Sequence, residues 1–211
     1  MKKKQDRQQI VKAIIEAAEL YKAKLVGRKF LYVFDNRYIE VIYKIVNFRH
    51  LTGVATDLSA KSFYQLAASR RLQTSQIYFT KDHPYDLCKK KIKHIREIAT
   101  LAGAESFMLE EIKTVTQTFK FGTTDLKFSL CFNREFDEFG AEKGECYVVE
   151  SLRDEDCFSR SKEAFMVTHI FSKANDKKQY TECLYMDVAS TMKDVPQNVQ
   201  AMLAEELMRI G

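Results

Sequence analysis

The feature that most constrains the fold is a change in hydrophobic period at about residue 107. Before that point apolar residues recur at helical spacing, as in Ile10, Ile14, Ala18 and Tyr21 near the N-terminus. After it, apolar and polar residues alternate, which is typical of strands with one buried face. Helices followed by a run of strands indicate an α+β fold rather than a parallel α/β fold. We therefore predict a single α+β domain over residues 1–211.

The predicted domain has three parts along the chain. They are an N-terminal helix (1–27), a hairpin, motif loop and helices (28–103), and an antiparallel sheet meander with a closing helix (104–211). The hairpin is expected because two β-rich runs flank Asp35-Asn36-Arg37. Two further helices are predicted, a long one over 84–102 and the closing one over 197–209. The N-terminal helices and the hairpin are expected to pack with the sheet.

Composition and charge exclude several classes of protein. The formal net charge of +5 permits contact with nucleic-acid phosphates without requiring it. Five cysteines without a C-x-x-C pair argue against a disulfide framework and a thiolate zinc site, so neither a metal nor a cofactor is expected. Charges interrupt the apolar residues near the N-terminus, and no stretch reaches the length of a membrane span. We therefore expect a cytoplasmic protein without membrane contact.

The segment Phe48-Arg49-His50-Leu51-Thr52-Gly53-Val54 is the strongest candidate for a functional site. His50 titrates near neutral pH and can act as a general acid or base. Arg49 can hold a phosphate through its fork of donors, and Gly53 permits unusual backbone angles. The alternative is a plain connector between a strand and a helix. In that case a backbone group would satisfy His50.

A predicted helix start lies shortly after this segment. Ser59 is a good N-cap, and Lys61 falls in the first turn. A cation there is electrostatically unfavourable unless an anion lies nearby. Lys61 and His50 are therefore candidates to frame one phosphate. The alternative is a solvated lysine.

The long predicted helix carries a dense basic stretch. This stretch is a candidate surface along a nucleic-acid backbone, although it can equally be the solvated face of an amphipathic helix. Its candidate nucleic-acid-binding residues are Lys89, Lys90, Lys93 and Arg96. The common nucleotide-binding, zinc-hydrolase and nucleophile-elbow motifs are absent from the sequence.

Several of these segments together resemble one family. They are 31–34, 38–41, 48–54 and 59–64, with His50-Leu51-Thr52-Gly53 as the most specific part. The chain resembles a phage- and mobile-element-associated branch of the Barnase–EndoU–colicin–RelE-like nuclease superfamily. The resemblance implies N-terminal helices on an antiparallel sheet. It also implies metal-independent RNA cleavage, in which the ribose 2′-hydroxyl attacks the adjacent phosphate.

The resemblance also implies roles for individual residues. His50 would act as acid or base, with Arg49 and Lys61 as phosphate stabilisers. Thr52 would be a hydrogen-bonding partner, and Ser151, near the end of a predicted strand, is a weaker candidate. The implied partner is RNA or a nucleoprotein complex.

Two other functions stay open at this stage. The first is a non-catalytic phage or mobile-element protein that binds and inhibits a host defence nucleoprotein complex, with acidic residues 135–138 and 154–156 as phosphate mimics. The second is a sequence-specific nucleic-acid binder, which no helix-turn-helix or aromatic RNA-binding motif supports. A protein partner and the oligomeric state are left open. Convergence of His50, Arg49 and Lys61 in one cleft would favour the nuclease.

Overall fold

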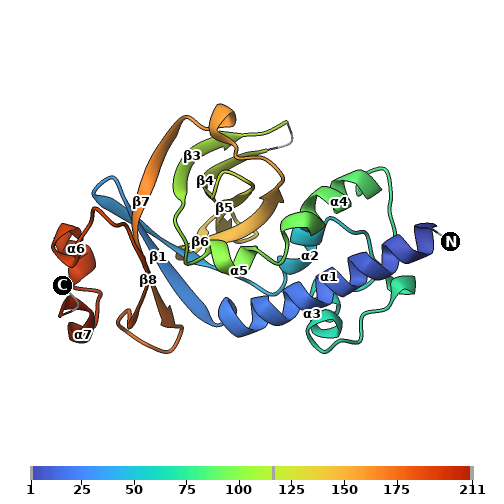
Figure 1. Ribbon diagram of the computed structural model, residues 1–211, viewed down its shortest axis with the longest axis horizontal. Coiled ribbons are helices and arrows are strands. Elements are labelled where there is room, and N and C mark those ends of the chain that lie inside the picture. Colours follow the sequence, from blue (N-terminus) through green and yellow to red (C-terminus); the bar gives the residue numbers. More distant parts are fainter. Residues whose placement is uncertain (1, 116, 210–211) are drawn as a thin grey trace.

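The protein combines a helical layer with one extensive sheet (Figure 1). The computed structural model describes residues 2–115 and 117–209. The α-helices of this part are α1 (Lys2–Lys24), α2 (Phe48–Thr52), α3 (Ala60–Ala68), α4 (Tyr85–His94), α5 (Ile98–Leu101), α6 (Gln197–Gln200) and α7 (Glu205–Met208). The strands are β1 (Arg28–Phe34), β2 (Arg37–Ile42), β3 (Phe107–Lys113), β4 (Thr118–Thr124), β5 (Ser129–Phe136), β6 (Glu142–Arg153), β7 (Glu163–Ala174) and β8 (Glu182–Met186).

The N-terminal hairpin forms as predicted. Strands β1 and β2 pair antiparallel from Lys29↔Ile42 to Phe34↔Arg37. Asp35 and Asn36 connect them with φ values of 47° and 55°. Two consecutive residues with positive φ match the twist of the flanking strands, and Asp and Asn tolerate this conformation better than most residues.

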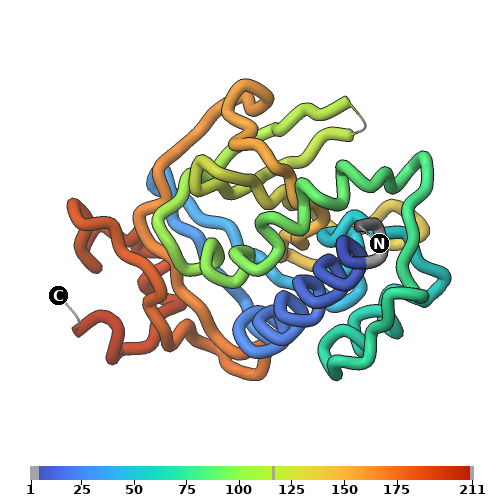
Figure 2. Tube along the Cα trace, turned by 45° about the vertical axis from the view of Figure 1, so that its right-hand side comes forward, coloured from blue at the N-terminus to red at the C-terminus, as the bar shows by residue number. Residues whose placement is uncertain are grey.

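The hairpin is part of the sheet, and it closes the sheet on itself. The strand order is β1-β2-β6-β5-β4-β3-β7-β8, and β1 also pairs with β7. Figure 2 shows the blue hairpin beside the orange β7, although more than a hundred residues separate them in the chain. Strand β8 extends the sheet beyond β7. The ring of strands removes most of the open edges that an isolated sheet would expose.

The predicted antiparallel meander is present only in part. Strands β3, β4, β5 and β6 are successive antiparallel neighbours, but β7 returns to pair with β3. In addition, β2 and β6 pair in parallel through Val41↔Tyr147 and Ile42↔Val148. The period-two pattern predicts which residues face the core, but it holds no information on which strands are neighbours.

Two predicted helices are broken in the structure. The helix expected over 84–102 ends at His94, and α5 begins only at Ile98 after a turn. The closing helix expected over 197–209 is two short helices, α6 and α7, separated by a turn. In both cases hydrophobic spacing continues across the turn, because short helical pieces can bury the same side of the chain that one longer helix would bury.

The core lies between α1 and the concave side of the sheet. Helix α1 buries Ile10, Ile14, Ala18 and Tyr21 in the same cluster as strand residues such as Phe30. Each large apolar side chain buried in this way contributes about 1.5–3 kcal/mol. A second cluster joins the opposite face of β1 to the C-terminal segment, so β1 is buried on both faces. In Figure 1, α1 to α4 lie on the right of the strands, whereas α6 and α7 lie on the left beside β8, against the outer face of β1.

Candidate active site

A pocket of about 380 Å³ opens between α2, the start of α4 and the end of β6. Side chains from four separate stretches of chain meet there, and they include two imidazoles, a lysine and an arginine. The lining residues are Asn47, His50, Gly53, Asp82, His83, Leu87, Lys91, Gln117, Glu150, Ser151 and Arg153. We call this hollow the His50 pocket.

Helix α2 positions His50 at the rim of the His50 pocket. Phe48 and Leu51 anchor the short helix in the core, which leaves His50 on its exposed side. The Nδ2 of Asn47 donates a hydrogen bond to the Val149 carbonyl oxygen of β6 at 3.0 Å. The segment that was predicted as a loop is therefore a helix fixed to the sheet.

Gly53 lets α4 approach the end of α2. It ends the helix with φ of 73°, in the left-handed region that favours glycine. A Cβ at this position would lie 3.0 Å from Lys91 Cδ and 3.3 Å from Cys88 Cα. With this close approach, Lys91 Nζ donates a hydrogen bond of 2.7 Å to the His50 carbonyl oxygen. Lys91 is thus held against the C-terminal end of α2, where a cation is favourable.

Burial and neighbouring cations shift the protonation of this pair. Burial lowers the pKa of His50, and Arg49, Lys91 and His83 lower it further. Burial, followed by the charge of Arg153, lowers the pKa of Lys91 to about 8. At neutral pH His50 is therefore mainly neutral, and Lys91 is charged but close to its titration point.

Arg153 supplies a further positive charge at the end of β6. Its Nη2 donates to Thr114 Oγ1 at 3.4 Å, and its guanidinium lies 5.6 Å from the centre of the Phe119 ring. Its buried Nε has no hydrogen-bond partner within residues 2–115 and 117–209. Nor does any carboxylate of that part of the chain lie within salt-bridge distance of this guanidinium. Two cations, Lys91 and Arg153, thus face the same small space, which the carboxylates of Asp82 and Glu150 also line. The unpaired guanidinium of Arg153 is the group best suited to an anionic ligand.

The predicted site residues divide into two groups. His50 and Ser151 both line the His50 pocket, and Ser151 is almost buried. Arg49 instead donates from Nη1 to the Leu58 carbonyl oxygen at 3.2 Å. Lys61 is exposed in the first turn of α3, and Ser59 caps that helix as predicted. The structure therefore brings His50 together with Ser151, but not with Arg49 or Lys61.

Thr52 has a local structural contact. Its side chain is fully buried, and Oγ1 donates to the Arg49 carbonyl oxygen at 2.7 Å. The same Oγ1 accepts a hydrogen bond from the Val54 amide at 3.3 Å. Thr52 thus stabilises the turn after α2 and does not line the His50 pocket.

The sequence did not predict the three other basic residues of the pocket, namely His83, Lys91 and Arg153. His83 precedes α4, and nothing nearby in the sequence connects it to His50. The position of Lys91 could have been recognised from the sequence, because it lies three residues after Cys88 and four before Ile95, both of which are buried. A lysine inside an apolar stripe is expected to reach a polar site or to pair with a carboxylate.

The remaining two histidines have structural partners. His94 is buried, stacks on Phe128 at 4.9 Å and bonds through Nε2 to Asp154 at 2.7 Å. His169 is fully buried, and its Nε2 lies 3.2 Å from the Thr191 carbonyl oxygen. Neither lines the His50 pocket.

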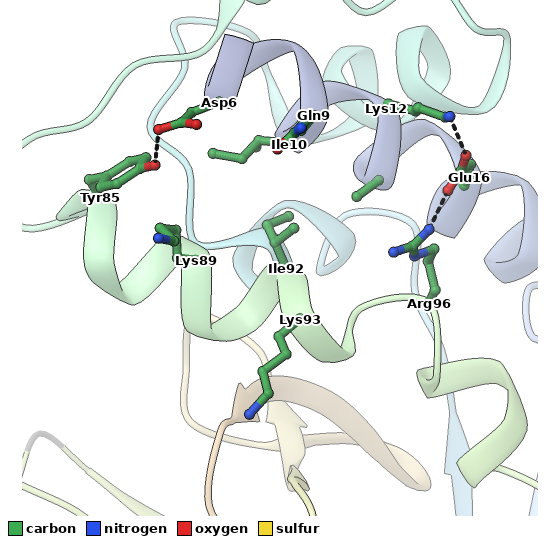
Figure 3. A pocket seen from close by; sticks show the side chains of 11 residues that line it. Asp6, Gln9, Ile10, Lys12, Glu16, Tyr85, Lys89, Ile92, Lys93 and Arg96 are labelled. Carbon is green, nitrogen blue, oxygen red and sulfur yellow. Dashed lines mark hydrogen bonds and ion pairs between the residues drawn. The ribbon is translucent and has the colours of Figure 1, made fainter. Parts of the chain in front are cut away.

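The predicted basic surface lies on another side of α4. Lys89, Lys93 and Arg96 line a groove of about 460 Å³ between α1 and α4 (Figure 3). Arg96 Nη1 bonds to Glu16 at 2.7 Å, and Lys93 Nζ lies 3.3 Å from Asp154 Oδ1. Lys90 is exposed beside them. We call this hollow the α1/α4 groove.

The described residues form neither a membrane-spanning helix nor a metal-binding cluster. No helix there is both long enough and apolar enough to cross a bilayer. The same residues contain no group of three or more His, Cys, Asp or Glu side chains arranged to hold a metal ion.

Comparison with protein families gives one match. Residues 13–189 match the family described as "phage-Barnase-EndoU-ColicinE5/D-RelE like nuclease4". The matched range contains every residue that lines the His50 pocket. No curated protein and no solved structure matches the chain.

Proposed function

The chain belongs to the phage-Barnase-EndoU-ColicinE5/D-RelE like nuclease family, and on this premise we propose that the His50 pocket cleaves RNA without a metal ion. One observation carries the proposal. His50 and His83 line the same pocket as Lys91 and Arg153. This combination supplies two groups that can exchange protons and two cations that can neutralise a phosphate.

The proposed reaction begins at the ribose 2′-hydroxyl. His50 takes its proton, because the lowered pKa of His50 keeps this imidazole neutral at pH 7. The 2′-oxygen then attacks the adjacent phosphorus. His83 gives a proton to the departing 5′-oxygen. The products are a 2′,3′-cyclic phosphate and a 5′-hydroxyl, so protons and electron pairs balance within one transesterification.

Lys91 and Arg153 would stabilise the charge that develops on the phosphate. Both lie in a partly enclosed pocket, where the effective dielectric is lower than in water and a charge acts more strongly. Ser151 lies on β6 beside Arg153 and can donate a hydrogen bond to a phosphate oxygen. Arg49 is assigned an indirect role, because its charge lowers the pKa of His50.

The contacts of the acidic stretches do not favour the alternative of a phosphate-mimicking inhibitor. Glu135 pairs with Lys44, and Asp137 accepts hydrogen bonds from the backbone of its own turn. Asp154 bonds to His94, and Glu155 pairs with Arg160. These contacts leave fewer free carboxylates in the two stretches to imitate a nucleic-acid backbone.

The test is cleavage of single-stranded RNA by the purified protein in the presence of a chelator. We expect products that end in a cyclic phosphate. Replacing His50 or His83 by Ala should each lower kcat by about 10²–10⁴-fold. The His50→Ala variant keeps the bond from Lys91, because that bond uses the His50 backbone oxygen. Lys61→Ala, outside the pocket, is the control and should retain full activity. If the folded wild-type protein leaves RNA uncut, the proposal is wrong.

A further inference from the structure

Helix α4 separates the two hollows that contain the basic residues. Lys91 lines the His50 pocket on one side, whereas Lys89 and Lys93 line the α1/α4 groove on the other. An α-helix has about 3.6 residues per turn. The four lysines therefore follow one another around α4 in the order Lys91, Lys90, Lys93 and Lys89.

Two of these lysines have no compensating charge. In the part of the chain that the structure describes, no carboxylate lies within 4.0 Å of the Nζ of Lys89 or Lys90. Both side chains are exposed. Lys89 Nζ lies 5.5 Å from the centre of the Tyr85 ring. Lys93 is paired with Asp154, but its side chain is 67% exposed, and exposed ion pairs are weak enough for a phosphate to compete.

The acidic groups of the α1/α4 groove already have partners. Figure 3 shows Asp6 accepting the Tyr85 hydroxyl, and Glu16 lying between Lys12 and Arg96. The Tyr85–Asp6 hydrogen bond measures 2.6 Å. Glu16 is neutralised by its two cations, whereas Asp6 keeps its charge. The groove lining nevertheless holds four cationic side chains against two carboxylates, so it can accept negative charge.

We propose that α4 guides the RNA strand out of the His50 pocket, over Lys90, to Lys89 in the α1/α4 groove. This inference rests on the proposed function, because it assigns the path of the same substrate beyond the cleaved phosphate. A helix with its side chains is about 10–12 Å across, so the arc from Lys91 over Lys90 to Lys89, just over half of the circumference, is about 18 Å long. A stacked strand rises about 3.4 Å per nucleotide, and the track therefore requires about five nucleotides on one side of the cleaved bond.

The test compares a ribodinucleotide with a decaribonucleotide in the wild-type protein and the Lys89→Ala/Lys90→Ala variant. We expect the variant to lower kcat/KM about tenfold for the decanucleotide and to leave the dinucleotide within about twofold. Two lost phosphate contacts should also reduce the salt dependence of log KM by about 1.4. The matched control is Lys177→Ala/Lys178→Ala, which removes two exposed lysines from the turn between β7 and β8. The inference is wrong if both double variants cleave the decanucleotide equally well.

A second measurement separates this inference from the proposed function. An all-deoxy decanucleotide has no 2′-hydroxyl, so it cannot be cleaved by the proposed chemistry, but it presents the same phosphates. We expect wild-type protein to bind it, and only the Lys89→Ala/Lys90→Ala variant to bind about tenfold more weakly. This result supports the track even if RNA cleavage is never observed. If the wild-type protein does not bind the oligonucleotide, the α4 surface serves another kind of partner, such as an acidic protein, and the inference is wrong.

Discussion

Lys91 and Lys90 are neighbours in the sequence, yet they occupy different chemical environments on α4. Lys91 lies under the end of α2, donates to a carbonyl oxygen and has its pKa lowered to about 8. Lys90 is exposed. Packing positions Lys91 to act on a single phosphate. The solvent-exposed Lys90 is instead suited to weak contacts with phosphates along a strand. Residue type within a basic run therefore does not decide the role of each lysine.

The largest expected effect is on kcat, and it should differ between these two lysines. Lys91→Met keeps the apolar stem but removes the charge, and we expect it to lower kcat for a ribodinucleotide about 10²-fold. Lys90→Met makes the same chemical change on the exposed side and should leave dinucleotide cleavage within about twofold. Rates for both variants, with circular dichroism as a check of folding, measure the difference. Equal losses would show that the two sides of α4 do not differ in function.

The pH dependence of kcat/KM tests the role of Lys91 in the His50 pocket. Wild-type kcat/KM should fall above pH 8, because Lys91 with a pKa of about 8 then loses its charge. At pH 9 the loss should be about tenfold. Lys91→Arg should make this alkaline limb shallower, because Lys91 is replaced by a guanidinium that stays protonated throughout the range, while the general acid His83 must still hold its proton. On the acid side, activity should fall only below the pH at which an ordinary histidine titrates, since the lowered pKa of His50 keeps the imidazole neutral further into the acid range. An alkaline limb unchanged in Lys91→Arg would assign it to another group.

Replacing Gly53 tests how strongly the close packing of α4 against α2 stabilises the protein. Gly53→Ala places a methyl group against Lys91 and Cys88 and forces a non-glycine residue to φ of 73°. We expect a loss of at least about 1–2 kcal/mol in the free energy of unfolding. Gly144→Ala is the matched control, because nothing lies within 4 Å of its Cβ position. Urea denaturation of both variants provides the measurement. A Gly53→Ala protein as stable as wild type would contradict this packing.

The smallest effect is expected from the ion pair in the α1/α4 groove. Arg96 and Glu16 lie 2.7 Å apart, with side chains 54% and 34% exposed. A double-mutant cycle with Arg96→Ala and Glu16→Ala should give a coupling free energy of only about 0.2–1 kcal/mol. Dinucleotide cleavage should not change. A coupling free energy above about 2 kcal/mol would contradict the description of this contact as a weak, exposed ion pair.

Local sequence patterns predicted the elements that depend on neighbouring residues. The spacing of Ile10, Ile14 and Tyr21 predicted the buried face of α1, and Asp35-Asn36 predicted the hairpin turn. The His50 segment was identified from its concentration of polar groups, and His50 does line a pocket. The breaks in the helices at 95–97 and 201–204 were missed, because hydrophobic periodicity continues across them.

The sequence by itself determined the α+β class, the hairpin and the family to which the chain belongs, because each depends on residues close together along the chain. Only the tertiary structure decided which side chains meet His50. The parallel pairing of β2 with β6 sets Arg153 and Ser151 beside α2, and the packing of α4 on Gly53 adds Lys91 and His83. Arg49 and Lys61 are nearer to His50 in sequence but lie outside the pocket. Helix α2 directs Arg49 and His50 to different sides, and Lys61 lies on a separate helix, α3. A site assembled from segments a hundred residues apart is a property of the packing, and no local pattern encodes it.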